Sequence, residues 1–168
     1  MGYGVLKVEK GKPYVIIVGS LDQRKIKDHF RKISCIFEKT LQLIDEYNPC
    51  ALAIESPFYG NNVQSLLKLG RAQGAAISAA LFRSVPVFEY APRKIKQSIT
   101  GYGNASKEQV AVLLQKTFNV SIVTDHLDAT DGLAAAVCHF YGRSVIGSTK
   151  ISKSWKDFIA LNPGRVKL

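Results

Sequence analysis

The sequence has no apolar run that approaches the roughly 18 to 20 residues of a membrane-spanning helix, which excludes a helical membrane protein. Its N-terminus, MGYGVLKVEKG, lacks the basic-then-apolar layout of a secretory signal. Cysteine is scarce, and the scattered Cys35, Cys50 and Cys138 have no metal-type spacing, which predicts reduced thiols in a cytoplasmic protein. Repeats, low-complexity tracts and linkers rich in Pro, Gly or Ser are also lacking, so the 168 residues predict one domain of ordinary size.

Acidic residues are few relative to basic ones: 13 Asp and Glu stand against 23 Lys and Arg, for a formal net charge of +10. This balance favours a polyanionic partner, because neutralised phosphates release their condensed counterions. A solvated basic surface, or a ribosomal protein, has the same balance. The charge therefore indicates nucleic acid as a partner and leaves the chemistry open.

Hydrophobic periodicity and turn residues divide the chain into strands and helices. The predicted strands are residues 4–8, 14–19, 51–55 and 84–91, with a turn at Gly11 to Pro13 between the first two. The predicted helices are residues 28–47, 63–83, 93–100, 107–118 and 125–141. Ser106 and Gln109 have the spacing of a capping box at the start of the fourth helix. This order predicts an α/β fold with a mixed sheet that opens on an antiparallel hairpin.

The predicted helix over residues 63–83 carries small residues along one side, where another backbone can approach closely. They are Gly70, Gly74, Ala75 and Ser78. Packing in the core of the same chain explains such a side as well as a helix-to-helix dimer contact does, and both alternatives stay open.

Carboxylates stand at two places where a buried element begins or ends. Glu55 closes the apolar strand, and an uncompensated buried carboxylate is costly, so it needs a partner or a chemical role. Asp125, Asp128 and Asp131 follow at i, i+3 and i+6 before an apolar stretch, and we assign Asp125 the ordinary role of a helix cap. Converging carboxylates suit Mg²⁺ or Mn²⁺, and two such ions can cleave a phosphodiester. A basic chain with an acidic cluster therefore predicts a metal-dependent nuclease.

Three segments, in this order and spacing, resemble the RuvC-type crossover junction endodeoxyribonucleases of the ribonuclease H-like superfamily. They are IESPFYGNNVQSLLKLGRAQGAA, PVFEYAPRKIKQSITGYGNASKEQV and DHLDATDGLAAAVCHF. The resemblance covers Gly2 to about residue 142 and implies a ribonuclease H-like nuclease domain over residues 1–142. Residues 143–168 would form a basic C-terminal tail, either an arm on DNA or a solvated end.

The resemblance implies that Glu55, Asp128 and Asp131 hold two Mg²⁺ ions, with Mn²⁺ as an alternative, across which water attacks a phosphate of a four-way DNA junction. It also implies that Phe58 stacks on bases at the junction centre, an interaction of about 1 to 3 kcal/mol. A loop aromatic that folds back on the core is the competing interpretation for Phe58. Tyr59 is equally eligible for the stacking role.

Basic residues and partners follow from the same resemblance. Lys96 and Lys107 match basic residues that face DNA in the family, and Arg71 and Arg93 are further candidates for phosphate contacts. The implied partners are four-way junction DNA, a second copy of the chain that docks along the helix of Gly70 and Gly74, and the RuvA and RuvB branch-migration proteins. A homodimer suits a junction, because two symmetric nicks fall on opposed strands.

One motif of the family has no counterpart in this chain. The family begins with a strand that ends in D-P-G, shortly before a G-Y-G strand, and here G-Y-G is residues 2–4. Asp22, Asp28 and Asp45 belong to a turn and the first helix, so none of them replaces the first catalytic aspartate. We therefore expect a ribonuclease H-like sheet that lacks its first, central strand, with unpaired backbone groups and weakened or abolished catalysis.

Three explanations of the missing motif compete. We expect a start upstream of Met1; the alternatives are a truncated, poorly folding copy and a junction-binding protein without nuclease activity. A nuclease of the same superfamily that acts on RNA–DNA hybrids is a further alternative, against which Phe58 and the dimer-type helix argue.

Overall fold

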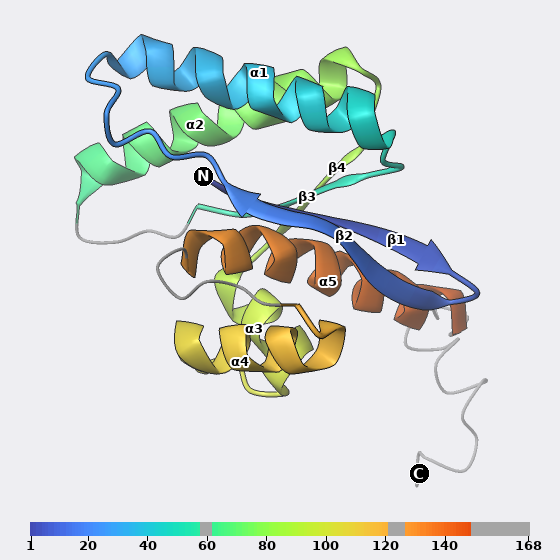
Figure 1. The fold of residues 1–168 in the computed structure, drawn as a ribbon. Helices are drawn as coiled ribbons and strands as arrows, with labels where there is room; N and C mark the ends of the chain where they lie inside the picture. Colours follow the sequence, from blue (N-terminus) through green and yellow to red (C-terminus); the bar gives the residue numbers. More distant parts are fainter. Residues whose placement is uncertain (58–61, 121–126, 149–168) are drawn as a thin grey trace, which may run out of the picture.

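The computed structural model of the protein describes residues 1–57, 62–120 and 127–148. The elements form three layers (Figure 1). Two helices, α1 (His29–Tyr47) and α2 (Val63–Phe82), cover one side of the strands. The other side is covered by α5 (Leu127–Ser148), with α3 (Pro92–Thr100) and α4 (Lys107–Phe118) beneath it. The predicted α/β class and its ribonuclease H-like arrangement of strands between helices are confirmed.

The hairpin pairs β1 (Gly2–Glu9) with β2 (Lys12–Ser20) in the predicted antiparallel direction. The predicted turn at Gly11 to Pro13 is wrong by one to two residues, because the turn residues are Lys10 and Gly11, with φ of 49° and 76°. Positive φ at both central residues matches the twist of a two-residue hairpin. Pro13 lies within β2, opposite Val8.

The second pair of strands is parallel and short. β3 (Leu52–Glu55) pairs with β4 (Val87–Tyr90), so that Glu55 lies opposite Tyr90 at the carboxyl end of both strands. One further backbone bond, from the Ser56 N–H to the Tyr90 carbonyl at 2.9 Å, extends the ladder past Glu55. The backbone of Glu55 is therefore held by pairing with β4 on both sides of this residue.

The mixed sheet that we expected is divided into an antiparallel half and a parallel half. Within the described residues, β1–β2 and β3–β4 form separate two-stranded sheets. α5 bridges the two halves, because it packs along β1, β2 and β3. The expected lack of the usual first, central strand stays a prediction.

The helix boundaries agree closely with the hydrophobic periodicity. The Asp28 carboxylate caps α1 by accepting from the Arg31 backbone N–H at 3.0 Å. The predicted capping box of α4 is confirmed, since Ser106 and Gln109 bond each other's backbone N–H. α5 continues to Ser148, past the predicted limit at residue 141 and through the domain boundary placed after residue 142. That boundary stays a prediction; the cap residue Asp125 and residues 149–168 lie outside the described residues.

Glycine lets β1 lie directly on α5. A Cβ on Gly4 would stand 2.8 Å from the Leu133 Cα, and one on Gly132 would stand 2.5 Å from the Tyr3 Cα. Leu133 and Val137 of α5 are fully buried beneath the hairpin. The G-Y-G strand and the G that follows D-x-x-D thus form one close backbone contact, which fixes the start of α5.

Within the part of the chain that the structure describes, no helix is both long and apolar enough to cross a membrane.

Candidate active site

Glu55 is the last residue of β3, and its side chain leaves the sheet at the carboxyl edge of the parallel pair. The edge of β3 that faces away from β4 leaves the Glu55 carbonyl without a strand partner among the described residues. The side-chain amide of Gln73 on α2 donates a hydrogen bond to this carbonyl. The strand end that carries the carboxylate is therefore tied to α2.

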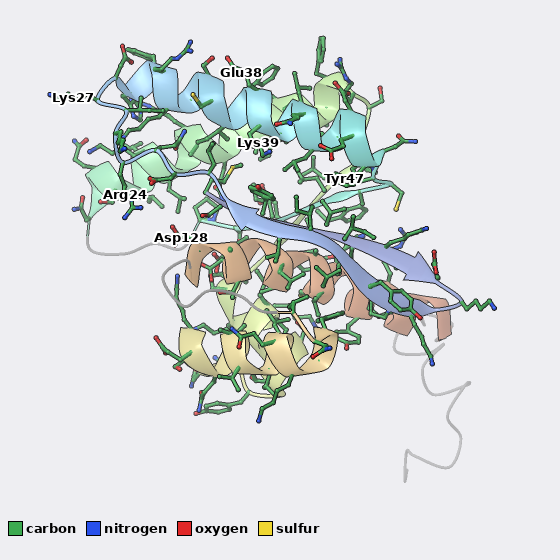
Figure 2. The ribbon with its side chains drawn as sticks, in the orientation of Figure 1. Arg24, Lys27, Glu38, Lys39, Tyr47 and Asp128 are labelled. Carbon is green, nitrogen blue, oxygen red and sulfur yellow. The ribbon has the colours of Figure 1, made fainter. Side chains whose placement is uncertain are left out.

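Asp128 and Asp131 lie on the first and second turns of α5. Figure 2 shows Asp128 at the beginning of this helix, below the strands. Gly2 of β1 lies so close to the Asp128 backbone carbonyl that a Cβ at this position would overlap it. The hairpin is thus in direct contact with the first turn of α5, which carries Asp128.

Lys107, the first residue of α4, reaches Asp131 across the site. Its Nζ donates to the Asp131 Oδ2 at 2.8 Å, and both side chains are about half exposed, at 56% and 40%. The bond to Asp131, assisted by the charges of Asp128 and Glu55, raises the pKa of Lys107. The lysine therefore stays charged, and its positive charge is attracted by all three carboxylates, Asp131, Asp128 and Glu55.

The charges of neighbouring residues affect the pKa of the Glu55 carboxyl. Partial burial raises the pKa of its carboxyl, and the negative charge of Asp131 raises that pKa further. The positive charges of Lys107 and Lys96 act in the opposite direction. Carboxylates and lysines from β3, α3, α4 and α5 therefore share one electrostatic environment, although they are up to 76 positions apart between Glu55 and Asp131.

The remaining predicted contact residues have less support from the structure. Arg71 lies exposed on α2, and the stem of Arg93 lies against the Gly103 backbone, so neither contacts the carboxylates in the described structure. Phe58, with its alternative Tyr59, lies outside the described residues. Gly70 and Gly74 both face open space, where an added Cβ would meet nothing within 4 Å.

Gln73 is the residue of this site that sequence reasoning missed. Its polar side chain stands beside small residues on the side of α2 that faces β3, within the segment KLGRAQGAA. A polar residue at the edge of a buried, small-residue helix face is a signal for a backbone partner, since buried polar groups need hydrogen bonds.

The donor set fits a hard divalent cation in its chemistry. Two carboxylates held close enough to raise a pKa leave excess negative charge that a cation would neutralise. The side chains are not gathered into a cage, because no group of three potential metal ligands stands at coordination distance among residues 1–57, 62–120 and 127–148. Lys107 supplies part of the neutralising charge in this arrangement.

Carboxylates at a strand end and a helix start, with lysines beside them and helices on both faces of the strands, define a nuclease of the ribonuclease H-like class. A family model described as "Crossover junction endodeoxyribonuclease RuvC" matches residues 1–139. The chain belongs to this RuvC family of hydrolytic, metal-dependent nucleases.

Relatives and solved structures agree with this assignment. The crossover junction endodeoxyribonuclease RuvC of Christiangramia forsetii is 54% identical over 170 residues, which cover 99% of this chain and 87% of the relative. The protein of the same description from Bacteroides fragilis is 55% identical over 171 residues, covering 99% and 90%. The structure of Thermus thermophilus RuvC in complex with a Holliday junction substrate superposes with a TM-score of 0.75 at 29% identity, covering 86% of this chain and 88% of that one.

Proposed function

We propose that this chain is a subunit of a Holliday junction resolvase, which makes paired symmetric nicks in four-way DNA junctions during recombination and repair. The observation that carries the proposal is the shared electrostatic environment of Glu55, Asp131 and Lys107 at one edge of the fold. The net charge of +10 supports a DNA substrate.

Glu55, Asp128 and Asp131 would hold the divalent cations, for which we propose two Mg²⁺, with Mn²⁺ as a substitute. The bound ions supply an activated water and stabilise the leaving oxygen. Gln73 holds the backbone of Glu55, and the close contact of β1 with α5 holds that of Asp128. Lys107 and Lys96 bring positive charge to the place where charge builds up on the phosphate, where it is worth most.

Further contacts with the junction belong to the same proposal. Arg71 and Arg93 would bind phosphates beside the site, and Phe58 would stack on bases at the junction centre. Association with RuvA and RuvB, and residence in the cytoplasm, stay predictions.

A homodimer through α2 completes the proposed resolvase. The outward side of this helix is apolar and unprotected: Val63, Leu67 and Leu81 are 53%, 51% and 60% exposed. Gly70 and Gly74 lie between them on the same side, and the core-facing side consists of alanines. An exposed apolar stripe with a glycine-lined centre suits close approach of a second helix, and two-fold symmetry matches two opposed nicks.

A second candidate function is junction binding without cleavage. It is favoured by the ion pair that neutralises Asp131 and by the absence of a three-ligand cluster among the described residues.

The test is incubation of the purified chain with a labelled synthetic four-way junction, in Mg²⁺ and in EDTA, beside the Glu55→Gln variant. We expect paired nicks only with Mg²⁺, no cleavage by Glu55→Gln and unchanged junction affinity of that variant. A retarded but uncut junction under all conditions would support the second candidate. Loss of binding by Glu55→Gln with unchanged specific cleavage activity would contradict the catalytic role of this residue.

A further inference from the structure

The loop between β2 and α1, together with the first turn of α1, is strongly basic and was not among the predicted DNA contacts. Residues 22–32 contain five Lys or Arg against two Asp. Both aspartates are engaged within the segment, because Asp22 binds the Arg24 guanidinium at 2.9 Å and Asp28 caps α1. The side chains of Lys25, Lys27 and Arg31 form no ion pair with any residue that the structure describes.

Internal hydrogen bonds give this loop a defined shape. The Asp22 carboxylate accepts from the Arg24 backbone N–H at 2.9 Å, and the Ile26 N–H donates to the Gln23 carbonyl at 3.1 Å. The Gln23 side chain then donates to the Lys32 carbonyl of α1 at 2.7 Å. A loop held in this way loses little further entropy when its cations bind a ligand.

The loop begins beside the candidate active site. Leu21 pairs with Met1 through two backbone bonds, of 2.8 and 3.2 Å, and the next residue, Gly2, lies against the Asp128 carbonyl. Figure 2 shows Arg24 and Lys27 toward the same end of the molecule as Asp128. The N-terminus of α2 lies at this end as well (Figure 1).

An exposed aromatic ring stands among these charges. Phe30, in the first turn of α1, is 77% exposed, more than any other large apolar side chain in the described part of the chain. Arg31 follows it in the sequence and Lys27 precedes it by three residues, and both are exposed. Basic side chains around a protruding apolar ring suit the charged backbone and apolar sugars of DNA better than they suit a protein core.

We infer that Lys25, Lys27, Phe30 and Arg31, named here the α1 entry surface, bind the backbone of a DNA arm that leaves the cleavage centre. The inference rests on the proposed function, because it takes the same DNA as its ligand. The cations contact phosphates, and Phe30 packs against a deoxyribose. The surface adds positive charge beyond that of Lys96 and Lys107, which lie on α3 and α4.

The test compares two double variants that remove equal charge. Lys25→Gln/Lys27→Gln changes the α1 entry surface, and Lys10→Gln/Lys12→Gln changes the hairpin tip at the opposite end of the molecule (Figure 1). Junction affinity is measured by fluorescence anisotropy in EDTA between 50 and 200 mM salt, so that the readout does not depend on cleavage. Loss of two phosphate contacts flattens the plot of log affinity against log salt by about 1.8, and we expect a roughly tenfold loss at 0.1 M salt.

The outcomes separate the two proposals. An equal response of the two double variants would overturn the α1 entry surface and leave junction binding in place. If the unaltered chain does not bind the junction even at 50 mM salt, the proposed function itself is wrong.

Phe30→Ala tests the apolar part of the surface. We expect weaker junction binding with an unchanged salt slope and an unchanged Tm, because the ring is exposed in the free chain. Weaker self-association with unchanged DNA affinity would show that Phe30 serves a protein contact, which would remove it from the surface.

Discussion

At the scale of single residues, Glu55 and Asp131 are like charges that act on each other, and Lys107, which binds Asp131, opposes both of them. The raised pKa of Glu55 has a thermodynamic consequence. A carboxyl with a pKa raised on folding destabilises the fold when it ionises, so stability is full below its unfolded pKa and decreases as pH rises through the folded pKa.

Glu55→Gln should therefore raise the Tm of the metal-free protein at pH 7 to 8, by no more than about 3 °C because the side chain is partly solvated. The two Tm values should converge below about pH 3.3, where the carboxyl is protonated in both the folded and the unfolded state. Thermal melts in EDTA across this pH range measure the difference. Added Mg²⁺ should stabilise the unaltered chain and not the variant, since only the former keeps the proposed ligand.

Glu108→Gln is the matched control, for which we expect a change in Tm of the opposite sign. The Ser106 hydroxyl and the backbone N–H lower the pKa of Glu108, so its charge stabilises the fold above the unfolded pKa and this effect is lost as pH falls. The control should lower the Tm at neutral pH. A pH-independent difference for Glu55→Gln would contradict the raised pKa.

At the scale of secondary-structure elements, the contact of β1 with α5 decides where the carboxylates of α5 lie. The two backbones approach through Gly4 and Gly132, where a β-carbon has no room. Gly142 lies ten residues further along the same helix. It has room for a β-carbon, because an added Cβ would stand 3.9 Å from the Tyr90 hydroxyl. Substitutions at Gly132 and Gly142 therefore separate the effect of the close backbone contact from the general effect of glycine in a helix.

Gly132→Ala should lower the free energy of unfolding by about 1 to 3 kcal/mol, because the methyl group forces β1 away from α5. Gly142→Ala should raise it by about 0.5 to 1 kcal/mol, the ordinary gain in a helix interior. Urea titrations followed by far-UV circular dichroism compare the two variants. Equal effects at both positions would show that the close contact is not maintained in solution.

At the scale of the whole molecule, the exposed stripe on α2 and the hydrogen bond from Gln73 to Glu55 belong to one helix, with Gln73 on its flank between the stripe and the buried alanines. A partner chain that covers the stripe would also press on the element that holds the end of β3. If the proposed dimer forms through α2, assembly and the geometry of the site would be coupled through this helix.

Gly74→Glu should weaken self-association by about 30-fold or more, comparable to the roughly 2 kcal/mol lost at an interface hot spot. The fold of the single chain should persist, since the position faces open space. Sedimentation equilibrium measures the association, with Gln64→Glu as a control that places the same charge elsewhere on the exposed surface of α2. Equal association constants for the two variants would contradict the proposed interface.

The local signals in the sequence were sufficient for the elements and for the positions of the carboxylates. Helix periodicity and caps depend on neighbours within about four residues, so the limits of α1, α2 and α4 were predicted within a residue or two. An apolar run that ends in Glu55, and the three-residue spacing of Asp128 and Asp131, likewise need no distant partner to be recognised.

The tertiary structure alone decided which of these residues meet. Lys107 binds Asp131 from another helix, and Gln73 holds the Glu55 carbonyl from 18 residues away. The division of the strands into two sheets also depends on pairing between distant segments, which no local pattern specifies. The sequence thus determined the chemistry that this protein carries, and long-range packing determined the geometry in which its charges face one another.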